Sequence, residues 1–320
     1  MSDTLSDVLR AVRLTGAVFF TVDGAAPWVT ETPDGRAIAA RILPGAEHLI
    51  DYHIVTSGAC WAGIVGEPAV RLEAGDVIVF PHGDTHVMSS APGLRGTPDP
   101  EIYERPETQL PTAVTRHGGG TERAALICGF LGCDARPFNP LIATLPRVIH
   151  VRAAAGDAAL APLIQLALAE STSRRAGGEA VLSHLSEVLF VEVVRRHLAA
   201  LAPDQRGWLA GLRDDQIGRA LGKLHDRPAH PWSLDELARA VGVSRSVLAD
   251  RFAHFVGLPP MAYLAQWRMQ LAANLLSGTG VGLGEVATRV GYGSEAALSR
   301  AFKRLVGVAP AVWRQGKRGD

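Results

Sequence analysis

Cysteine is scarce in this chain: Cys60, Cys128 and Cys133 are the only three among 320 residues. Three is an odd number and too few for the disulfide framework of a small secreted domain. We therefore expect three reduced thiols packed as small apolar side chains. A regulatory disulfide between Cys128 and Cys133 is the minor alternative.

Long apolar runs are also missing. The longest candidate, residues 158–169, contains a proline and falls short of the roughly 18 residues that a transmembrane helix needs. Residues 14–22 follow two arginines in the manner of a signal sequence, but two aspartates precede them, and we read the run as a first strand. The sequence predicts a cytoplasmic protein without a membrane partner.

The chain has no net charge, because 32 basic residues balance 32 acidic ones. The balance is uneven along the sequence. Residues 208–320 hold 15 Lys and Arg against 9 Asp and Glu, whereas the remainder holds 17 against 23. A basic C-terminal third behind an acidic front suggests that only the C-terminal part meets a polyanion.

The length favours two domains, and the pattern changes near residue 150. Before that point, short runs typical of strands are separated by Gly, Pro and Asp, which predicts an all-β front half. These runs are VFFTV, AIAARIL, YHIVT, ACWAGIV, AVRLE, DVIVF and RAALICGF. Residues 90–121 are rich in Pro and Gly and predict a long mobile loop, either a lid or a disordered segment.

From residue 157 the period becomes helical. Leu182, Leu185, Leu189 and Val193 recur at spacings of three or four and form one apolar stripe. Such a stripe is most often ordinary core, and a dimer seam is the alternative.

The last third contains an internal repeat. Leu234, Glu236, Ala238, Val241 and Gly242 recur 49 residues later. After one extra residue, a second set recurs 50 residues later: Leu248, Phe252, Val256, Gly257 and Pro260. Each copy predicts a short helix, a turn and a second helix.

The local chemistry of the first copy is that of a helix-turn-helix motif. Ser233 and Glu236 predict a capping box, Ala238 lets a second helix cross closely, and Gly242 permits a turn with positive φ. Between the copies, an uninterrupted helix is predicted from Pro260 to Ser277, about 25 Å long. It would hold two recognition helices about one DNA turn, ~34 Å, apart.

The repeat resembles the AraC/XylS family of bacterial transcription regulators. The segments that carry the resemblance are WSLDELARAVGVSRSVLADRF, YLAQWRMQLAANLL and GYGSEAALSRAFKRLVGVAPAVWR, within residues 208–317. The resemblance implies that residues 207–320 are a double helix-turn-helix domain that binds double-stranded promoter DNA. It further implies an activator that works with RNA polymerase, and a homodimer formed by a helical connector at 152–206.

The resemblance also assigns DNA-contacting positions. Arg300 is expected to read guanine, because its guanidinium can bond O6 and N7 together. Arg245, Arg251, Lys303 and Arg304 are expected on phosphates. Asp250 is expected to pair with Arg251 or another neighbour, and accepting from cytosine N4 is the alternative. The remaining positions are Ser246, Ala249, Ser294, Glu295, Ala296 and Ser299. We expect Leu248, Phe252, Leu298, Phe302 and Trp267 in the core.

In the front half, GDVIVFPHGDTH places Gly75, Pro81, Gly83 and His86 in the pattern of a second cupin motif. Residues 1–151 thereby resemble the cupin-like sensory domains that precede AraC-type DNA-binding domains. The first cupin motif departs from the metal-binding pattern, because its candidate ligands stand out of register. These are Glu47, His48, Asp51 and His53.

Two readings of the cupin interior stay open. His53, His86 and Cys128 form a reasonable set for zinc or another transition metal, completed by water, Asp51 or His82. The plain alternative is hydrogen-bonded histidines and a packed cysteine. Without a metal, the interior becomes a pocket for a small-molecule effector. Its expected lining is Trp28, Tyr52, Trp61 and His86.

We therefore expect an α+β multidomain protein with a cupin-like β-barrel, a helical connector and an all-α double helix-turn-helix domain. The expected function is a sequence-specific transcription regulator controlled by a small molecule or a metal. The alternative is a cupin-type metal-dependent enzyme with an appended DNA-binding domain, but we identify no complete ligand set and no catalytic residue for it.

Overall fold

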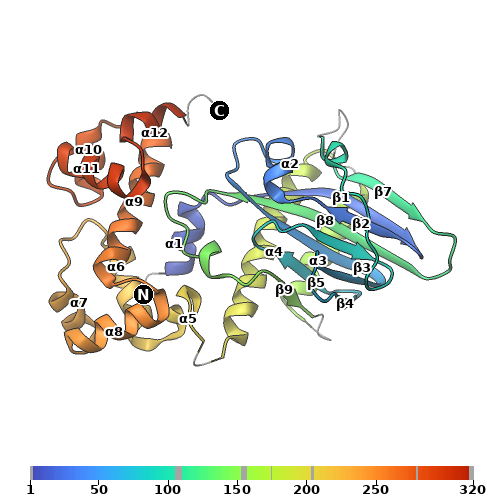
Figure 1. Ribbon diagram of the computed structural model, residues 1–320, viewed down its shortest axis with the longest axis horizontal. Coiled ribbons are helices and arrows are strands. Elements are labelled where there is room, and N and C mark those ends of the chain that lie inside the picture. The colour runs from blue at the N-terminus through green and yellow to red at the C-terminus, as the bar shows by residue number, and fades with distance from the viewer. Residues whose placement is uncertain are drawn as a thin grey trace. The chain divides into compact units, whose positions relative to one another are not determined.

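The computed structural model describes residues 3–104, 110–152, 157–173, 175–202, 205–278 and 280–316 (Figure 1). It divides into two compact units. The sheet unit contains 14–133 and 145–199. The helical unit contains 1–13, 134–144 and 200–320. Among the described residues, no helix is long and apolar enough to cross a membrane.

The sheet unit is built on one curled nine-stranded sheet with the main order β2-β6-β3-β8-β1-β7. β4 pairs with β3, and β5 lies between β3 and β9. Neighbouring strands are antiparallel except for β1 and β7. The strands are β1 Thr15–Ala25, β2 Val29–Thr32, β3 His48–Ile64, β4 Val70–Glu73, β5 Val77–Phe80, β6 His86–Ser89, β7 Thr112–His117, β8 Arg123–Cys133 and β9 Ile149–Val151.

Strand alternation divides the side chains between two sides of this sheet. Along β3, Leu49 and Val55 join a buried hydrophobic cluster, which also contains Phe80 of β5 and Cys128 of β8. We call the side that carries this cluster the inner face. Because Asp51 and His53 lie at even spacing from Leu49, they share the inner face.

The helix α2, Gly35–Ile42, replaces one of the predicted strands. The run AIAARIL was interpreted as a strand, and this prediction was wrong. Asp34 caps the helix by accepting from the Arg36 backbone N–H, and Ile38 and Ile42 are buried four residues apart. A short apolar run fits either period, so only packing decides between them.

The segment 90–121 is more ordered than predicted. It contains the short 3-10 helix η1, Pro100–Tyr103, and the strand β7, which pairs with β1 from Phe20 to Ala25. The prediction of one long mobile loop is therefore wrong for these parts. Residues 105–109 of that segment lie outside the described residues.

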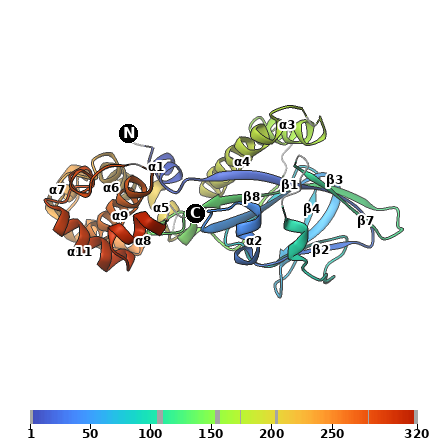
Figure 2. The same cartoon turned by 90° about the horizontal axis from the view of Figure 1, so that it is seen from above.

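Two helices, α3 Leu160–Ser173 and α4 Gly178–Ala200, pack together on one side of the sheet (Figure 2). The predicted apolar stripe of α4 is buried: Leu182, Leu185, Leu189 and Val193 are at most 5% exposed. The stripe is thus core, and the dimer-seam alternative is wrong for it. Ser183 Oγ donates to the Gly16 carbonyl at 2.6 Å, which fixes α4 against β1.

The helical unit carries both copies of the repeat. Its helices are α1 Thr4–Ala11, α5 Trp208–Arg213, α6 Asp215–Asp226, α7 Leu234–Val241, α8 Arg245–Val256, α9 Pro260–Gly278, α10 Leu283–Arg289, α11 Glu295–Val306 and α12 Pro310–Gly316. The N-terminal helix α1, which the sequence analysis did not predict, packs on α6 and α9 (Figure 1).

The expected helix boundaries are confirmed. Ser233 Oγ accepts from the Glu236 N–H at 3.1 Å, and Gly242 takes the left-handed conformation with φ 80°. The second half of the capping box is not used, because the Glu236 carboxylate bonds instead to His230 Nε2 at 2.7 Å. Ser244 and Ser294 cap the second helix of each motif.

Candidate nucleic-acid interface and buried histidine pair

The second helix of each motif, α8 or α11, has one buried and one exposed side. Leu248 and Phe252 of α8, and Leu298 and Phe302 of α11, are fully buried, as predicted, and Trp267 of the connecting helix α9 is 2% exposed. These contacts turn the opposite side of each helix outward. A helix anchored in this way can present its polar side to a major groove.

The predicted DNA-contacting residues lie on or beside these outward sides. On α8, Arg245, Ser246, Asp250 and Arg251 are exposed, and Ala249 is half-buried. On α11 and its cap, Ser299 is half-buried and the others are exposed: Ser294, Glu295, Ala296, Arg300, Lys303 and Arg304. The Ser294 hydroxyl already has a structural role, because it accepts from the Ala297 N–H at 3.2 Å.

The two outward sides differ in charge. On α8, Arg245 Nε lies 3.0 Å from an Asp235 carboxylate oxygen, and Arg251 pairs with Asp214. The expected pair between Asp250 and Arg251 does not form. On α11, no carboxylate among the described residues forms an ion pair with Arg300, Lys303 or Arg304. The second motif therefore presents the stronger positive charge to a polyanion.

In the sheet unit, two histidines meet on the inner face. His53 Nε2 and His86 Nε2 are 2.8 Å apart, and both side chains are buried. His86 Nδ1 lies 2.8 Å from the Asp84 carbonyl, which can only accept, so Nδ1 carries the proton. His86 Nε2 then accepts from His53 Nε2–H. This arrangement leaves His53 Nδ1 as a buried acceptor without a hydrogen-bond partner.

Both histidines are held in the neutral form. Burial lowers the pKa of His86 to about 4, and burial with the neighbouring His86 lowers the pKa of His53 well below its ordinary value. The hydrogen bond between the rings itself requires a neutral His86, because a protonated His86 Nε2 has no lone pair with which to accept.

Asp51 adds a second unsatisfied group on the same face. Its side chain is fully buried, and neither carboxyl oxygen has a hydrogen-bond partner. Burial raises the pKa of Asp51 well above its ordinary value, with smaller effects from Asp34 and Asp84. Unpaired polar groups in an apolar interior are destabilising unless another group bonds to them. Asp51 and His53 Nδ1 therefore indicate a place for a bound polar group.

The predicted metal set is only partly brought together. Cys128 lies directly opposite His53 in the register of β3 and β8. Burial, with Cys60 and Asp51 nearby, raises the pKa of the Cys128 thiol, whereas metal binding needs the thiolate. His82 bonds to the Leu145 carbonyl instead. Across the described ranges, no three His, Cys, Asp or Glu side chains are placed to hold one ion. In this arrangement the described residues present no complete set of metal ligands.

The predicted effector lining separates into two groups. Trp28 belongs to the cluster on the inner face, where His86 also lies. Tyr52 points the other way, toward α4, and its hydroxyl lies 2.6 Å from Ser186 Oγ. Trp61 is half-buried and neighbours Cys60 of the inner cluster in sequence, so it faces the opposite side. Adjacent strand residues cannot share a face, which is why Tyr52 and Trp61 do not line the same space as His86.

Sequence reasoning missed Tyr103, whose ring packs edge-on against Phe20 and Phe130 of the inner cluster. Tyr103 sits in the segment that was predicted to be mobile, and nothing in its local sequence signals this packing. Asp51 was considered only as an extra metal ligand. Its position two residues before His53 in an apolar strand was the available signal.

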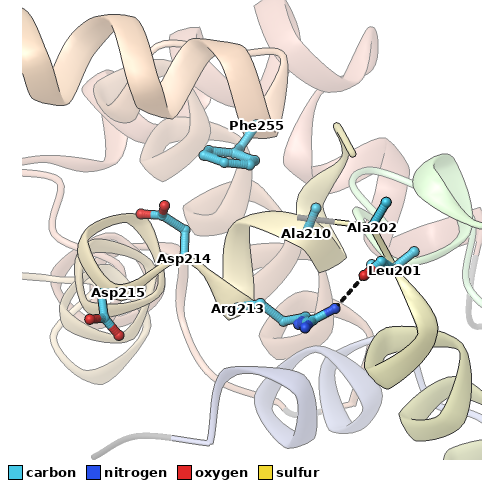
Figure 3. A pocket seen from close by; sticks show the side chains of 7 residues that line it. All are labelled: Leu201, Ala202, Ala210, Arg213, Asp214, Asp215 and Phe255. Carbon is cyan, nitrogen blue, oxygen red and sulfur yellow. Dashed lines mark hydrogen bonds between the residues drawn. The ribbon is translucent and has the colours of Figure 1, made fainter. Parts of the chain in front are cut away.

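A pocket of about 330 Å³ lies in the helical unit beside α5 and the end of α8 (Figure 3). Its lining is Leu201, Ala202, Ala210, Arg213, Asp214, Asp215 and Phe255. Arg213 Nη1 donates to the Leu201 carbonyl at 2.6 Å, and Asp214 caps α6 while pairing with Arg251. Because its main polar groups already have partners, we assign no ligand to it.

Comparison with known proteins agrees with both units. A family model described as Cupin matches residues 3–199, and one described as Helix-turn-helix domain matches residues 237–316. The chain is 34% identical over 318 residues to an AraC-like transcription regulator of Streptomyces lividans, with 98% of each chain covered. It is 31% identical to an AraC-like transcription regulator of Streptomyces antibioticus, again with 98% of each covered.

A third relative, the HTH-type transcriptional regulator AlkR of Acinetobacter baylyi, is 27% identical over 316 residues. The alignment covers 98% of this chain and 99% of that protein. These relatives are named as transcription regulators, and the similarity spans both units and the segments between them. The exposed recognition helices, the curled sheet and this full-length similarity together place the chain in the family of AraC-like transcription regulators, with a cupin domain joined to a DNA-binding helix-turn-helix domain.

Proposed function

We propose that this regulator binds promoter DNA with α8 and α11 in successive major grooves, under the control of an effector in the cupin domain. The observation that carries the proposal is the duplicated motif, with two anchored helices whose outward sides are polar. The connecting helix α9 has 19 residues and is therefore about 28 Å long. That length supports a spacing near one DNA turn.

Within this interface, Arg300 is assigned to direct readout of guanine. It is exposed on α11 and has no ion-pair partner among the described residues, so its guanidinium is available. Lys303 and Arg304 are assigned to phosphates. Arg251 and Arg245 are weaker phosphate candidates, because each would first have to leave its carboxylate partner.

Replacing Arg300 with alanine is expected to weaken binding to the preferred site by about 1–3 kcal/mol and to flatten the preference at one base pair. The site is obtained by selecting a randomised duplex library with the wild-type protein, and affinities are measured by fluorescence anisotropy. Lys303→Ala serves as the matched control, with an equal loss on all sequences. An equal loss on all sequences for Arg300→Ala would remove Arg300 from the base-reading residues.

For the effector, we propose a site at Asp51 and His53 on the inner face. Its support is the pair of buried groups without partners: the neutral imidazole Nδ1 accepts a hydrogen bond, and a protonated carboxyl both donates and accepts. A small organic molecule with a donor and an acceptor satisfies both. The absence of a third well-placed ligand among the described residues favours this class over a metal ion.

Elemental analysis separates the two effector classes. We expect less than one equivalent of transition metal in full-length protein purified without chelators, and the same content in Cys128→Ser. One equivalent in the wild type that is lost in both His53→Ala and Cys128→Ser would instead make the effector a metal held by the predicted set.

We further propose that the regulator is a homodimer that activates transcription with RNA polymerase. The support for a dimer is the outward side of α4, where Val181 and Val188 are 40% and 50% exposed. With His184 and Val191 they recur at spacings of three and four, the pattern of a helix-packing seam. This seam lies on the opposite side of α4 from the buried leucine stripe.

Replacing Val188 with arginine is expected to convert the dimer to a monomer, because a charge would enter an apolar contact. Light scattering after size-exclusion chromatography measures the mass. Val70→Arg, at a valine of β4 that is 37% exposed, is the matched control and should remain dimeric. A dimeric Val188→Arg protein would place the interface elsewhere.

A further inference from the structure

We propose that Arg268 is a positioning residue that fixes the separation of the two recognition helices and thereby sets the spacing between the two halves of the DNA site. The inference rests on the proposed bipartite binding. Arg268 lies in the middle of α9, the helix that connects the two motifs, and its side chain is part-buried.

The Arg268 guanidinium bonds to backbone on both sides of the connection. Nε donates to the Pro228 carbonyl at 2.7 Å, and Nη2 donates to the His230 carbonyl at 2.8 Å. Both carbonyls belong to the loop that precedes the first motif. Nη1 donates to the Gly291 carbonyl at 3.4 Å, in the turn of the second motif. One side chain therefore bonds to both halves of the duplicated domain.

The two halves also touch directly beside this side chain. Gly291 has φ 80°, and a Cβ placed on it would lie 2.5 Å from the Ala229 carbonyl oxygen. The turn of the second motif thus packs backbone against backbone on the loop before the first motif, and only glycine allows that approach. The Tyr292 ring lies 5.7 Å from the Arg268 guanidinium and covers it.

Only arginine has the chemistry for this position. Its planar group carries five N–H donors in a fixed fork, whereas lysine offers a single ammonium on a flexible stem. Replacing Arg268 leaves three carbonyls without these donors at a place where the two halves touch. Each motif keeps its own core, with Phe252 in the first and Phe302 in the second. The fixed placement of the two motifs relative to each other should therefore be lost before either motif unfolds.

The test uses full-length protein and the duplex selected by the wild type. Affinity is measured by fluorescence anisotropy for that duplex and for versions in which one or two base pairs are inserted between its half-sites. The wild type should tolerate only the selected spacing. Arg268→Ala should bind the selected duplex at least 10-fold more weakly and should lose the preference among spacings. Arg268→Lys should be intermediate, and Gly291→Ala should reproduce the loss of spacing preference.

Arg314→Ala is the matched control, because Arg314 also donates to a carbonyl, that of Val281, but within the second motif alone. It should keep the spacing preference. Circular dichroism checks that each variant is folded. If Arg268→Ala does not fold, the spacing preference is tested with Arg268→Lys in its place. Sharp spacing preference in folded Arg268→Ala or Arg268→Lys, whatever its affinity, would overturn the inference. A wild type that selects no DNA at all would instead refute the proposed function, and the inference with it.

Discussion

Affinity for the selected duplex is expected to fall about 40-fold to 150-fold when monovalent salt rises from about 50 to about 200 mM. Each phosphate that a protein cation neutralises releases counterions, and the logarithm of affinity falls with slope of about −0.9 per contact. We expect Lys303 and Arg304, with Arg245 and Arg251 as weaker contributors, to supply three to four such contacts. The measurement is anisotropy across a salt series.

The slope can be assigned to residues. The double variant Lys303→Ala, Arg304→Ala should reduce the slope by about 1.8, because two contacts are removed. Arg71→Ala is the control: Arg71 lies on β4 of the sheet unit, with its side chain 59% exposed, and should leave the slope unchanged. An unchanged slope in the double variant would place the phosphates on another surface.

The free energy of unfolding is expected to fall steeply as the pH drops from 6.5 to 4. Burial lowers the pKa of His86 to about 4 and that of His225 in the helical unit to about 4. Between these values and the ordinary 6.5, the unfolded chain binds protons that the folded chain does not. These two histidines therefore cost no stability above pH 6.5. As the pH falls to 4, each of them lowers the free energy of unfolding by about 3 kcal/mol.

Asp51 has the opposite effect on how the free energy of unfolding changes with pH. Because its pKa is raised in the folded state, the unfolded chain gains by ionising it at neutral pH, and this destabilisation fades as the pH falls toward 3.8. Asp51→Asn, which cannot ionise, should therefore raise the free energy of unfolding at pH 7 and leave it little changed near pH 4. The comparison isolates one buried carboxyl from the histidines around it.

Urea unfolding at pH 7, 6, 5 and 4 measures both effects. His225→Gln should remove one histidine's share of the pH dependence, and His117→Gln is the matched control, since His117 is exposed on β7. A pH dependence equal in the wild type and in His225→Gln would mean that His225 accepts a proton in the folded state. The prediction for buried histidines would then be wrong.

Much of the helical unit was predictable from the sequence. Caps and turns act within four residues: Ser233 bonds to Glu236, and Gly242 takes a positive φ where a helix must end. Duplication of this pattern, with Phe252 and Phe302 at matching positions, indicated two similar motifs before any packing was known. The bond from Glu236 to His230 was not predictable, because the Ser233 backbone N–H and the His230 ring competed for the same carboxylate.

The inner face of the sheet was predictable only in part. His53 and His86 were expected together, and they meet, because each lies in a short apolar run that a curled sheet turns inward. Tyr52 was assigned to the same space, although strand alternation sends it toward Ser186. The run at 37–43 was ambiguous, as short apolar runs are in general, because so few residues fit both the period of a helix and the period of a strand.

The sequence by itself determined the duplicated motif, the length of α9 and the outward placement of Arg300, because these depend on local caps and helical period. Tertiary structure alone decided which segments share a core. Gln270 is fully buried in α9; it donates to the Ala11 carbonyl at 3.1 Å and accepts from the Phe138 N–H at 3.0 Å. These partners are 259 and 132 residues away in sequence. No local pattern encodes such contacts, because their free energy exists only once the chain has folded and the amide has left water.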